Sequence, residues 1–195
     1  MIRTRRLAAT IAALLAILIP AVARPTSIGP PTAGLEPFKA WLEKEHPGYR
    51  CDRGPAWFLN RSVEAAYPRR RFAYVLSYTL GIPRPERNML SLVAEVTGDG
   101  AMRPLRPWTA AVYGVGLIPV RSAADARRAA AGVLVLAMGD PAEGRDHVEE
   151  RLVTARRRRG AWLCTFSHGA HYVSEVRFDR QGRLADFRVN TPPVP

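Results

Sequence analysis

The feature that most constrains the fold of this chain is an alternation of apolar and polar residues over residues 161–189. Trp162, Cys164 and Phe166 fall on one face of a first strand, because successive side chains of a strand point to opposite sides. Residues 172–178 alternate again, and a turn that contains Asp and Gly leads into a third strand. The stretch therefore predicts an antiparallel meander with one apolar face, which another part of the chain must cover.

A helix predicted over residues 123–138 is the candidate cover for this meander. Its apolar stripe is rich in small side chains, which let a helix lie close to a sheet. Ser122 is placed to cap the helix, with Asp125 where a capping box usually has Glu or Gln. Residues 148–157 suit either a strand or a helix, and we favour a fourth strand because Arg159-Gly160 leads directly into the meander.

The N-terminal half is predicted to combine helix and strands in the same way. The predicted segments are a helix over residues 35–45, strands over residues 72–80 and 90–96, and an edge strand within residues 101–105. Residues 56–67 suit either a short helix or irregular cover. Residues 108–120 contain two Gly and one Pro, which favours a bridging strand or an irregular connection.

Together these segments predict an α+β fold, in which an antiparallel β-sheet packs against one or two helices. The predicted divisions are a signal peptide (1–23), a flexible leader (24–34), an N-terminal α+β unit (35–119), a C-terminal helix with its meander (120–190) and a tail (191–195). The triplets 94–96 and 174–176 both precede turns that contain Gly, so we also raise the hypothesis that the two units share one plan.

The N-terminus has the pattern of a secretory signal peptide. Arg3, Arg5 and Arg6 form a positive head, residues 7–22 are almost wholly apolar, and residues 21–23 have the small-x-small form of a cleavage site. The pattern predicts a secreted or periplasmic protein, and an uncleaved N-terminal membrane anchor is the alternative. No later apolar run is long enough to span a bilayer, so we expect no membrane span after signal removal.

The chain is strongly basic, with a formal net charge of +12. Dense basic runs bind anionic polymers, and the candidate anion-binding residues are Arg156, Arg157, Arg158 and Arg159. A shorter run covers residues 69–71. Because Lys39 and Lys44 are the only lysines, a general preference for arginine accounts for such runs equally well. The predicted export argues against a nucleic-acid partner.

Cys51 and Cys164 are the only cysteines. In an oxidising compartment an even pair favours a disulfide, which would connect the N-terminal half to the meander. The alternative is that Cys164 is a small buried apolar residue beside Trp162 and Phe166.

His168 and His171, separated by Gly and Ala, form the cluster with the most chemical interest. Cys164 with either histidine would make a thiol nucleophile and its base. The two histidines are also candidate metal ligands, with a third ligand from Asp179, Asp186 or His147. Ordinary turn histidines explain the cluster without any metal, and no phosphate-binding loop or metalloprotease helix is present.

The segment Tyr172-Val173-Ser174-Glu175-Val176-Arg177-Phe178-Asp179, followed by Gly182-Arg183-Leu184, resembles the Y-x-x-x-V-x-F-D-x-x-G-x-L hairpin of small exported bacterial PepSY or cystatin-like modules. The resemblance covers about a quarter of the chain. It implies a non-catalytic binding or inhibitory module, although those families usually have a longer second helix than this sequence predicts.

We therefore expect an exported, non-catalytic binding or envelope-associated module that needs no cofactor. The expected partner is an envelope protein or an anionic polymer. The alternatives are a thiol- and His-dependent hydrolase centred on Cys164 and a basic surface protein that binds anionic polymers through its arginines.

Overall fold

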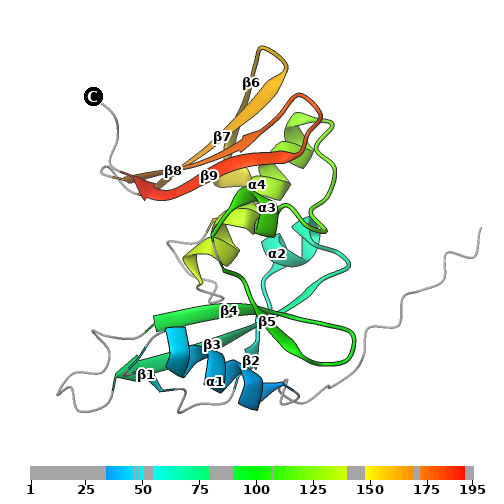
Figure 1. Ribbon diagram of the computed structural model, residues 1–195. Coiled ribbons are helices and arrows are strands. Elements are labelled where there is room, and N and C mark those ends of the chain that lie inside the picture. The colour runs from blue at the N-terminus through cyan, green and yellow to red at the C-terminus, as the bar shows by residue number, and fades with distance from the viewer. Residues whose placement is uncertain are drawn as a thin grey trace, which may run out of the picture.

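The computed structural model describes residues 34–45, 47, 49–50, 55–79, 90–106, 108–139, 148–168 and 172–191. These residues form an α+β fold with two antiparallel sheets, as the sequence predicts. In Figure 1, α1 (Leu35–Glu45) lies beneath the first sheet, and the second sheet lies at the top. Between the sheets lie α2 (Arg61–Ala66), α3 (Ala110–Tyr113) and α4 (Ala123–Met138).

The first sheet is covered on both faces. Its strands are β1 (Tyr49–Arg50), β3 (Arg71–Thr79), β4 (Leu90–Val96) and β5 (Met102–Pro104) in that order, and β2 (Ala56–Trp57) also pairs with β3. Because side chains alternate along a strand, Leu92 packs with Phe38 and Leu42 of α1, whereas Phe72 and Val93 belong to the core on the opposite face.

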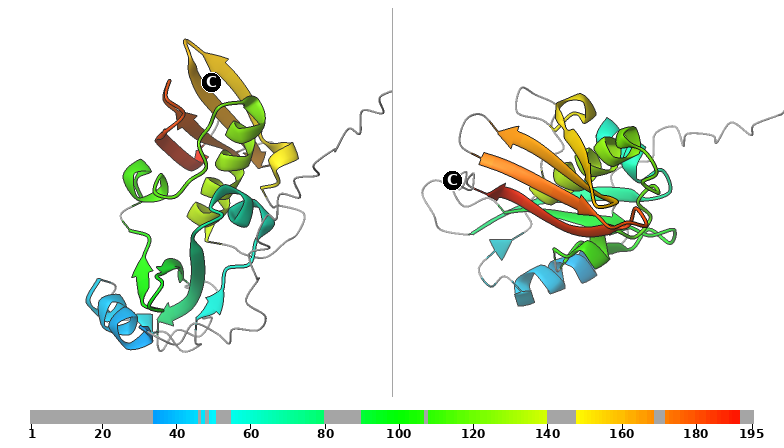
Figure 2. Two further views of the ribbon diagram at one scale, coloured as in Figure 1. Left: turned by 90° about the vertical axis from the view of Figure 1, so that its right-hand side faces the viewer. Right: turned by 90° about the horizontal axis from the view of Figure 1, so that it is seen from above.

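The second sheet is the predicted meander with one further strand. Its order is β6 (Thr154–Arg158), β7 (Ala161–His168), β8 (Tyr172–Phe178) and β9 (Leu184–Thr191), each paired with the next. Figure 2 (right) shows these strands from above, with helices beneath them. Cys164, Val176 and Phe178 are buried on the covered face. The prediction that residues 123–138 cover the meander is confirmed, since α4 contacts all four strands.

Local signals at both ends determine where α4 begins and ends. The Ser122 hydroxyl accepts a hydrogen bond from the Asp125 N–H, and the Asp125 carboxylate accepts one from the Ser122 N–H, which is a complete capping box. Gly139 ends the helix in the left-handed conformation, with φ +70°. The helix also packs closely against α2, so one apolar core joins elements of both predicted units.

In three segments the structure differs from the prediction made from the sequence or decides between its alternatives. Residues 110–113 form α3 in place of the predicted bridging strand or irregular connection, because the Thr109 hydroxyl accepts from the Val112 N–H and starts a helical turn. The predicted strand at 148–157 begins only at Thr154, after a 3₁₀ turn, η2 (Glu150–Leu152). The ambiguous segment 56–67 divides into β2 and α2.

No helix in the described ranges is long and apolar enough to cross a bilayer. Residues 1–33 and 192–195 lie outside the described residues. The signal peptide, its alternative as an anchor, and most of the leader and tail therefore stay predictions.

Candidate functional site

Cys164 lies on β7 against α4 and has no solvent-exposed surface. Its Sγ is 3.4 Å from the carbonyl oxygen of Ala126, to which the thiol donates a hydrogen bond. Burial raises the pKa of the Cys164 thiol to about 12, although Arg127 acts in the opposite direction. A protonated, inaccessible thiol is a poor nucleophile, so the geometry does not favour the hydrolase alternative.

The Cys164 thiol is free among the described residues, and the disulfide with Cys51 stays a prediction. Cys51 itself lies outside the described residues, whereas Cys164 belongs to the second sheet. The alternative interpretation, that Cys164 is a buried apolar residue with Phe166 beside it, describes its surroundings.

The histidine cluster falls mostly outside the described part of the chain. The backbone of His168 ends β7, four residues after Cys164 and therefore about 13 Å along the strand. That separation is too long for a direct bond between a thiol and its base. The His168 side chain, and both His171 and His147, lie outside the described residues.

The two carboxylates proposed as further metal ligands are already bonded to arginines. Asp179 is 3.1 Å from the Arg183 guanidinium and accepts from the Arg183 N–H, while Asp186 is 3.7 Å from Arg188. No three His, Cys, Asp or Glu side chains of the described residues lie together. A metal site at the histidines stays a prediction, and both aspartates have arginine partners.

Cys164 is expected to resist thiol reagents in the native protein, because its burial excludes them and keeps the thiol protonated. In a Cys51→Ser variant, which leaves one thiol, less than about one tenth of the protein should react with an aromatic disulfide reagent at pH 8 before unfolding. The same variant in denaturant should react completely. Full reaction of the native protein within minutes would contradict the burial of Cys164. It would also support the alternative in which Cys164 is a nucleophile.

The arginine run forms the tip of the β6–β7 hairpin. Arg158 pairs with Ala161, so Arg159 and Gly160 alone make the turn. Their φ angles are +50° and +88°, and positive φ at both positions is what a type I′ turn requires. We call Arg156 to Arg159 together with Gly160 the arginine hairpin.

The register with β7 determines which way the hairpin arginines point. Arg156 lies opposite Leu163 and Arg158 opposite Ala161, whereas the neighbouring Ala155 lies opposite the buried Cys164. Because residues on alternate positions share a face, Arg156 and Arg158 lie on the face of the sheet turned away from α4. β6 is also an edge strand, and no strand of the described residues pairs with its outer side.

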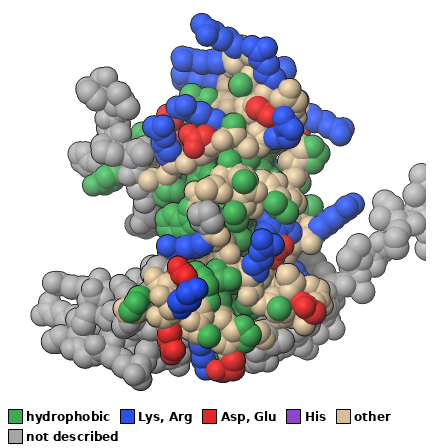
Figure 3. Space-filling model, viewed as in Figure 1, with side chains coloured by type: hydrophobic (Ala, Val, Ile, Leu, Met, Phe, Trp, Pro, Cys, Tyr) green, Lys and Arg blue, Asp and Glu red, His purple; other side chains and the backbone are tan. Residues whose placement is uncertain are grey.

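Three arginines of the hairpin have no acidic partner among the residues that the structure describes. Arg156, Arg158 and Arg159 are exposed, and none forms an ion pair with a residue that the structure describes. In the same sheet the contrasting ion pairs are Arg177–Glu175, Arg183–Asp179 and Arg188–Asp186. Figure 3 shows Lys and Arg side chains gathered at the top of the molecule, over this hairpin.

Arg157 has a different, structural environment. Its guanidinium lies 5.6 Å from the centre of the Trp162 ring, and its Nε donates to the Gly160 carbonyl. Arg180 adds a further cation at this end, since a Cβ on Gly160 would lie 3.3 Å from Arg180 Cγ. The hairpin therefore presents a rigid turn with several cations around it.

The second basic run, residues 69–71, is largely part of the fold. Arg70 is almost completely buried and bonds to both carboxylate oxygens of Glu95, at 2.7 and 2.8 Å. Arg71 lies over the Trp57 ring, 5.0 Å from its centre. The two runs look alike in the sequence, but among the described residues this one has a single exposed guanidinium without an ionic or ring partner, Arg69, whereas the arginine hairpin has three.

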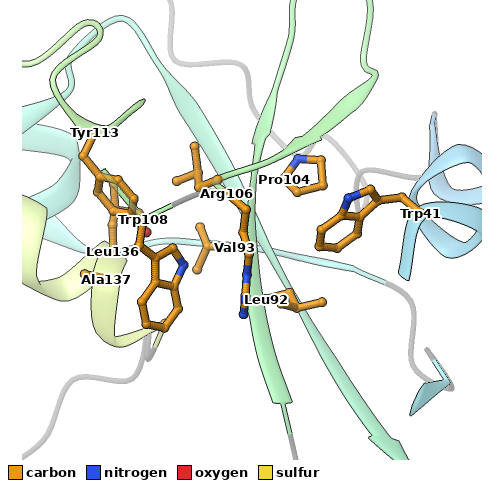
Figure 4. Close-up of a pocket in the computed structure, with 11 residues that line it drawn as sticks. Trp41, Leu92, Val93, Pro104, Arg106, Trp108, Tyr113, Leu136 and Ala137 are labelled. Atoms are coloured by element: carbon orange, nitrogen blue, oxygen red, sulfur yellow. The ribbon is translucent and has the colours of Figure 1, made fainter. Parts of the chain in front are cut away.

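A groove at the β5 edge of the first sheet is a second surface, and sequence reasoning missed it. It has about 280 Å³ of space, part of it open solvent. Figure 4 shows Trp41 and Trp108 on opposite sides of the strands, with Arg106 between them. We call this groove, which is lined by Trp41, Leu92, Arg106 and Trp108 among other residues, the aromatic groove. The sequence feature that could have pointed to this groove is Arg-Pro-Trp at residues 106–108, next to a predicted edge strand.

No protein-family model, curated protein or solved structure matches this chain. The resemblance of its C-terminal hairpin to PepSY and cystatin-like modules therefore stays a prediction. The candidate sites rest on the geometry of the described residues.

Proposed function

We propose that the protein is an exported, non-catalytic module that binds an anionic polymer of the cell envelope through the arginine hairpin. The observation that carries the proposal is the set of exposed arginines at the hairpin tip, Arg156, Arg158 and Arg159, which lack acidic partners among the described residues. The signal-peptide pattern of residues 1–23 supports an envelope location.

The chemistry of arginine suits such a ligand. A guanidinium group stays charged at all physiological pH values and donates paired hydrogen bonds to phosphate or carboxylate groups. Arg156 and Arg158 lie two residues apart on one face of an edge strand, so their spacing along the strand is about 7 Å. A line of cations at an open edge can contact successive anionic groups of a linear polymer.

The folded hairpin also reduces the conformational entropy that is lost on binding. The type I′ turn at Arg159 and Gly160 holds the backbone in one conformation, and pairing with β7 orders Arg156 and Arg158. The backbone that carries these arginines is ordered before the ligand arrives, so less conformational entropy is lost on association.

Retention on immobilised linear polyphosphate tests the proposal. The wild-type protein, without residues 1–23, is expected to bind at 50 mM NaCl and to elute as salt is raised, because salt screens these contacts. The triple variant Arg156→Gln, Arg158→Gln, Arg159→Gln should elute at a clearly lower salt concentration. Arg157 is left in place because it contacts Trp162.

The matched control removes the same number of charges from the same sheet. The triple variant Arg177→Gln, Arg183→Gln, Arg188→Gln replaces arginines that already have carboxylate partners. Its elution should stay closer to that of the wild type. Equal shifts for the two triple variants would mean that net charge alone governs binding, and the hairpin would not be a specific site.

A further inference from the structure

The outer face of the second sheet, which is turned away from α4, adjoins the arginine hairpin. We propose that the polymer bound there is an acidic glycan, a chain of sugar rings with acidic groups, which lies along β6 and β7 on this face. The inference rests on the proposed function and names the class of polymer. Three features of the face carry it: a block of paired charges, an apolar floor and a pair of hydroxyl groups.

Leu163 lies near the centre of the β6–β7 half of this face. Cys164, the next residue of β7, is buried and donates its thiol hydrogen to a carbonyl of α4, so by alternation Leu163 points outward. The register places Arg156 on one side of Leu163 and Arg177 on the other. Figure 2 (right) looks down on this face, with the helices beneath the strands. The four strands lie within the described ranges 154–168 and 172–191.

The β8–β9 half of the face is electrically neutral. Glu175 is 3.0 Å from Arg177 on β8, and Asp186 is 3.7 Å from Arg188 on β9. Across the two strands Glu175 also lies opposite Arg188, and Arg177 lies opposite Asp186. These four side chains neutralise one another, so an anionic chain gains no net attraction there. The favourable charge lies in the β6–β7 half, which carries the arginine hairpin.

The β6–β7 half combines cations with an apolar floor. Ala161 and Leu163 are half-buried and lie directly opposite Arg158 and Arg156. Their spacing along the strand, about 7 Å, equals that of the two arginines. Polyphosphate has no apolar surface to place on this floor. The C–H faces of sugar rings do, so a chain of rings with acidic groups can contact the floor and the guanidinium groups together.

A pair of hydroxyl groups continues these rows beyond Leu163. Thr154 lies opposite Thr165, and their Oγ atoms are 2.6 Å apart. The Thr154 hydroxyl is also 3.5 Å from the Thr165 carbonyl oxygen. The two hydrogens are shared within this group, which leaves acceptor lone pairs for a ligand. A sugar hydroxyl can donate to them, whereas an ionised phosphate chain has no donor. A glycan chain parallel to β7 therefore contacts the cations, the floor and the hydroxyls.

Calorimetry with three probe ligands tests the class of polymer. The protein without residues 1–23 is expected to bind hexagalacturonate, which combines sugar rings with carboxylates, and linear hexaphosphate, which has the charge without the rings. The methyl ester of hexagalacturonate has the rings without the charge. It should bind about tenfold more weakly than the acid, because it forms no charge-assisted hydrogen bonds with the arginines.

Two substitutions change the floor or the hydroxyl pair without changing the charge. Leu163→Thr removes apolar surface, and Thr165→Val removes a hydroxyl while keeping nearly the same shape. Each should weaken hexagalacturonate binding by about fivefold and leave hexaphosphate binding within about twofold of the wild type. Val173→Thr, which changes an outward residue of β8 opposite Ser167, is the matched control and should alter neither ligand. The thermal midpoint of each variant checks that it is folded.

The outcomes separate this inference from the proposed function. The glycan assignment is overturned if the wild type binds hexaphosphate but not hexagalacturonate. It is also overturned if Leu163→Thr and Thr165→Val bind hexagalacturonate as the wild type does, while the Arg156→Gln, Arg158→Gln, Arg159→Gln variant loses both polyanions. If that triple variant binds both ligands with wild-type affinity, the proposed function itself fails, and this inference fails with it.

Discussion

Replacing Glu95 with alanine is expected to lower the free energy of unfolding by about 3 kcal/mol, because it leaves a buried guanidinium without its partner. Arg70 is 8 % exposed and Glu95 is 21 % exposed, and the two side chains form two parallel hydrogen bonds. Arg70 also lies over the Phe72 ring and donates to the carbonyl of Val115. Urea denaturation of the variant measures the loss.

An exposed ion pair supplies the control for Glu95. The Asp186–Arg188 pair is 3.7 Å long and both side chains are about half exposed, so Asp186→Ala should change stability by less than about 1 kcal/mol. Equal effects of the two substitutions would contradict the distinction between a buried and an exposed pair.

The pH dependence of the Glu95 effect has a definite sign. The hydrogen bonds from Arg70 hold the pKa of the Glu95 carboxyl below its ordinary value of 4.5, in spite of its partial burial. A group with a depressed native pKa adds stability above its unfolded-state pKa and loses it as the pH falls through the native value. The difference between wild type and Glu95→Gln should therefore be constant near neutral pH and shrink below pH 4.5.

Replacing Gly132 with valine is expected to destabilise the protein by about 3 kcal/mol or more, because the added atoms would overlap α2. An ideal Cβ at Gly132 would lie 2.2 Å from the Ala66 Cβ and 2.9 Å from the Ser62 carbonyl oxygen. In an exposed helix, replacing Gly usually stabilises by up to about 1 kcal/mol. At Gly132 the close packing between α2 and α4 makes the replacement destabilising instead.

Gly98→Ala is the matched control for Gly132, since nothing lies within 4 Å of an added Cβ there. Its thermal midpoint should differ little from that of the wild type. If Gly132→Val melted at the wild-type temperature, the close contact of α2 with α4 would be wrong, and with it the position of α4 between the two sheets.

The regular elements were predictable where local signals and periodicity agree. The bounds of α4 follow from a capping box at Ser122 and from Gly139, and its small side chains explain how it fits beneath the meander. The helix at residues 35–45 also has the predicted bounds, because its apolar positions recur at helical spacing. In the meander β8 alternates regularly, whereas register shifts interrupt its pairing with β9.

Other features depend on contacts that no local pattern encodes. The helix α3 is one turn long, too short for an apolar period, and its only signal is the cap at Thr109. Trp41 and Trp108 line the aromatic groove from opposite sides of the strands, although they are far apart in the chain. The sequence located the arginine run, but only the register of β6 and the acidic partners of neighbouring strands distinguish free arginines from paired ones.

The salt dependence of polymer affinity tests the central claim most directly. Binding of linear polyphosphate is measured by calorimetry between 50 and 300 mM NaCl, and the logarithm of the association constant is plotted against the logarithm of the salt concentration. Each arginine that no longer neutralises a phosphate makes the slope shallower by about one. The Arg156→Gln, Arg158→Gln, Arg159→Gln variant is predicted to have a slope shallower by about two to three, while the Arg177→Gln, Arg183→Gln, Arg188→Gln variant keeps nearly the wild-type slope. Coincident slopes for the wild type and the hairpin variant would contradict the assignment of the polymer site to the arginine hairpin.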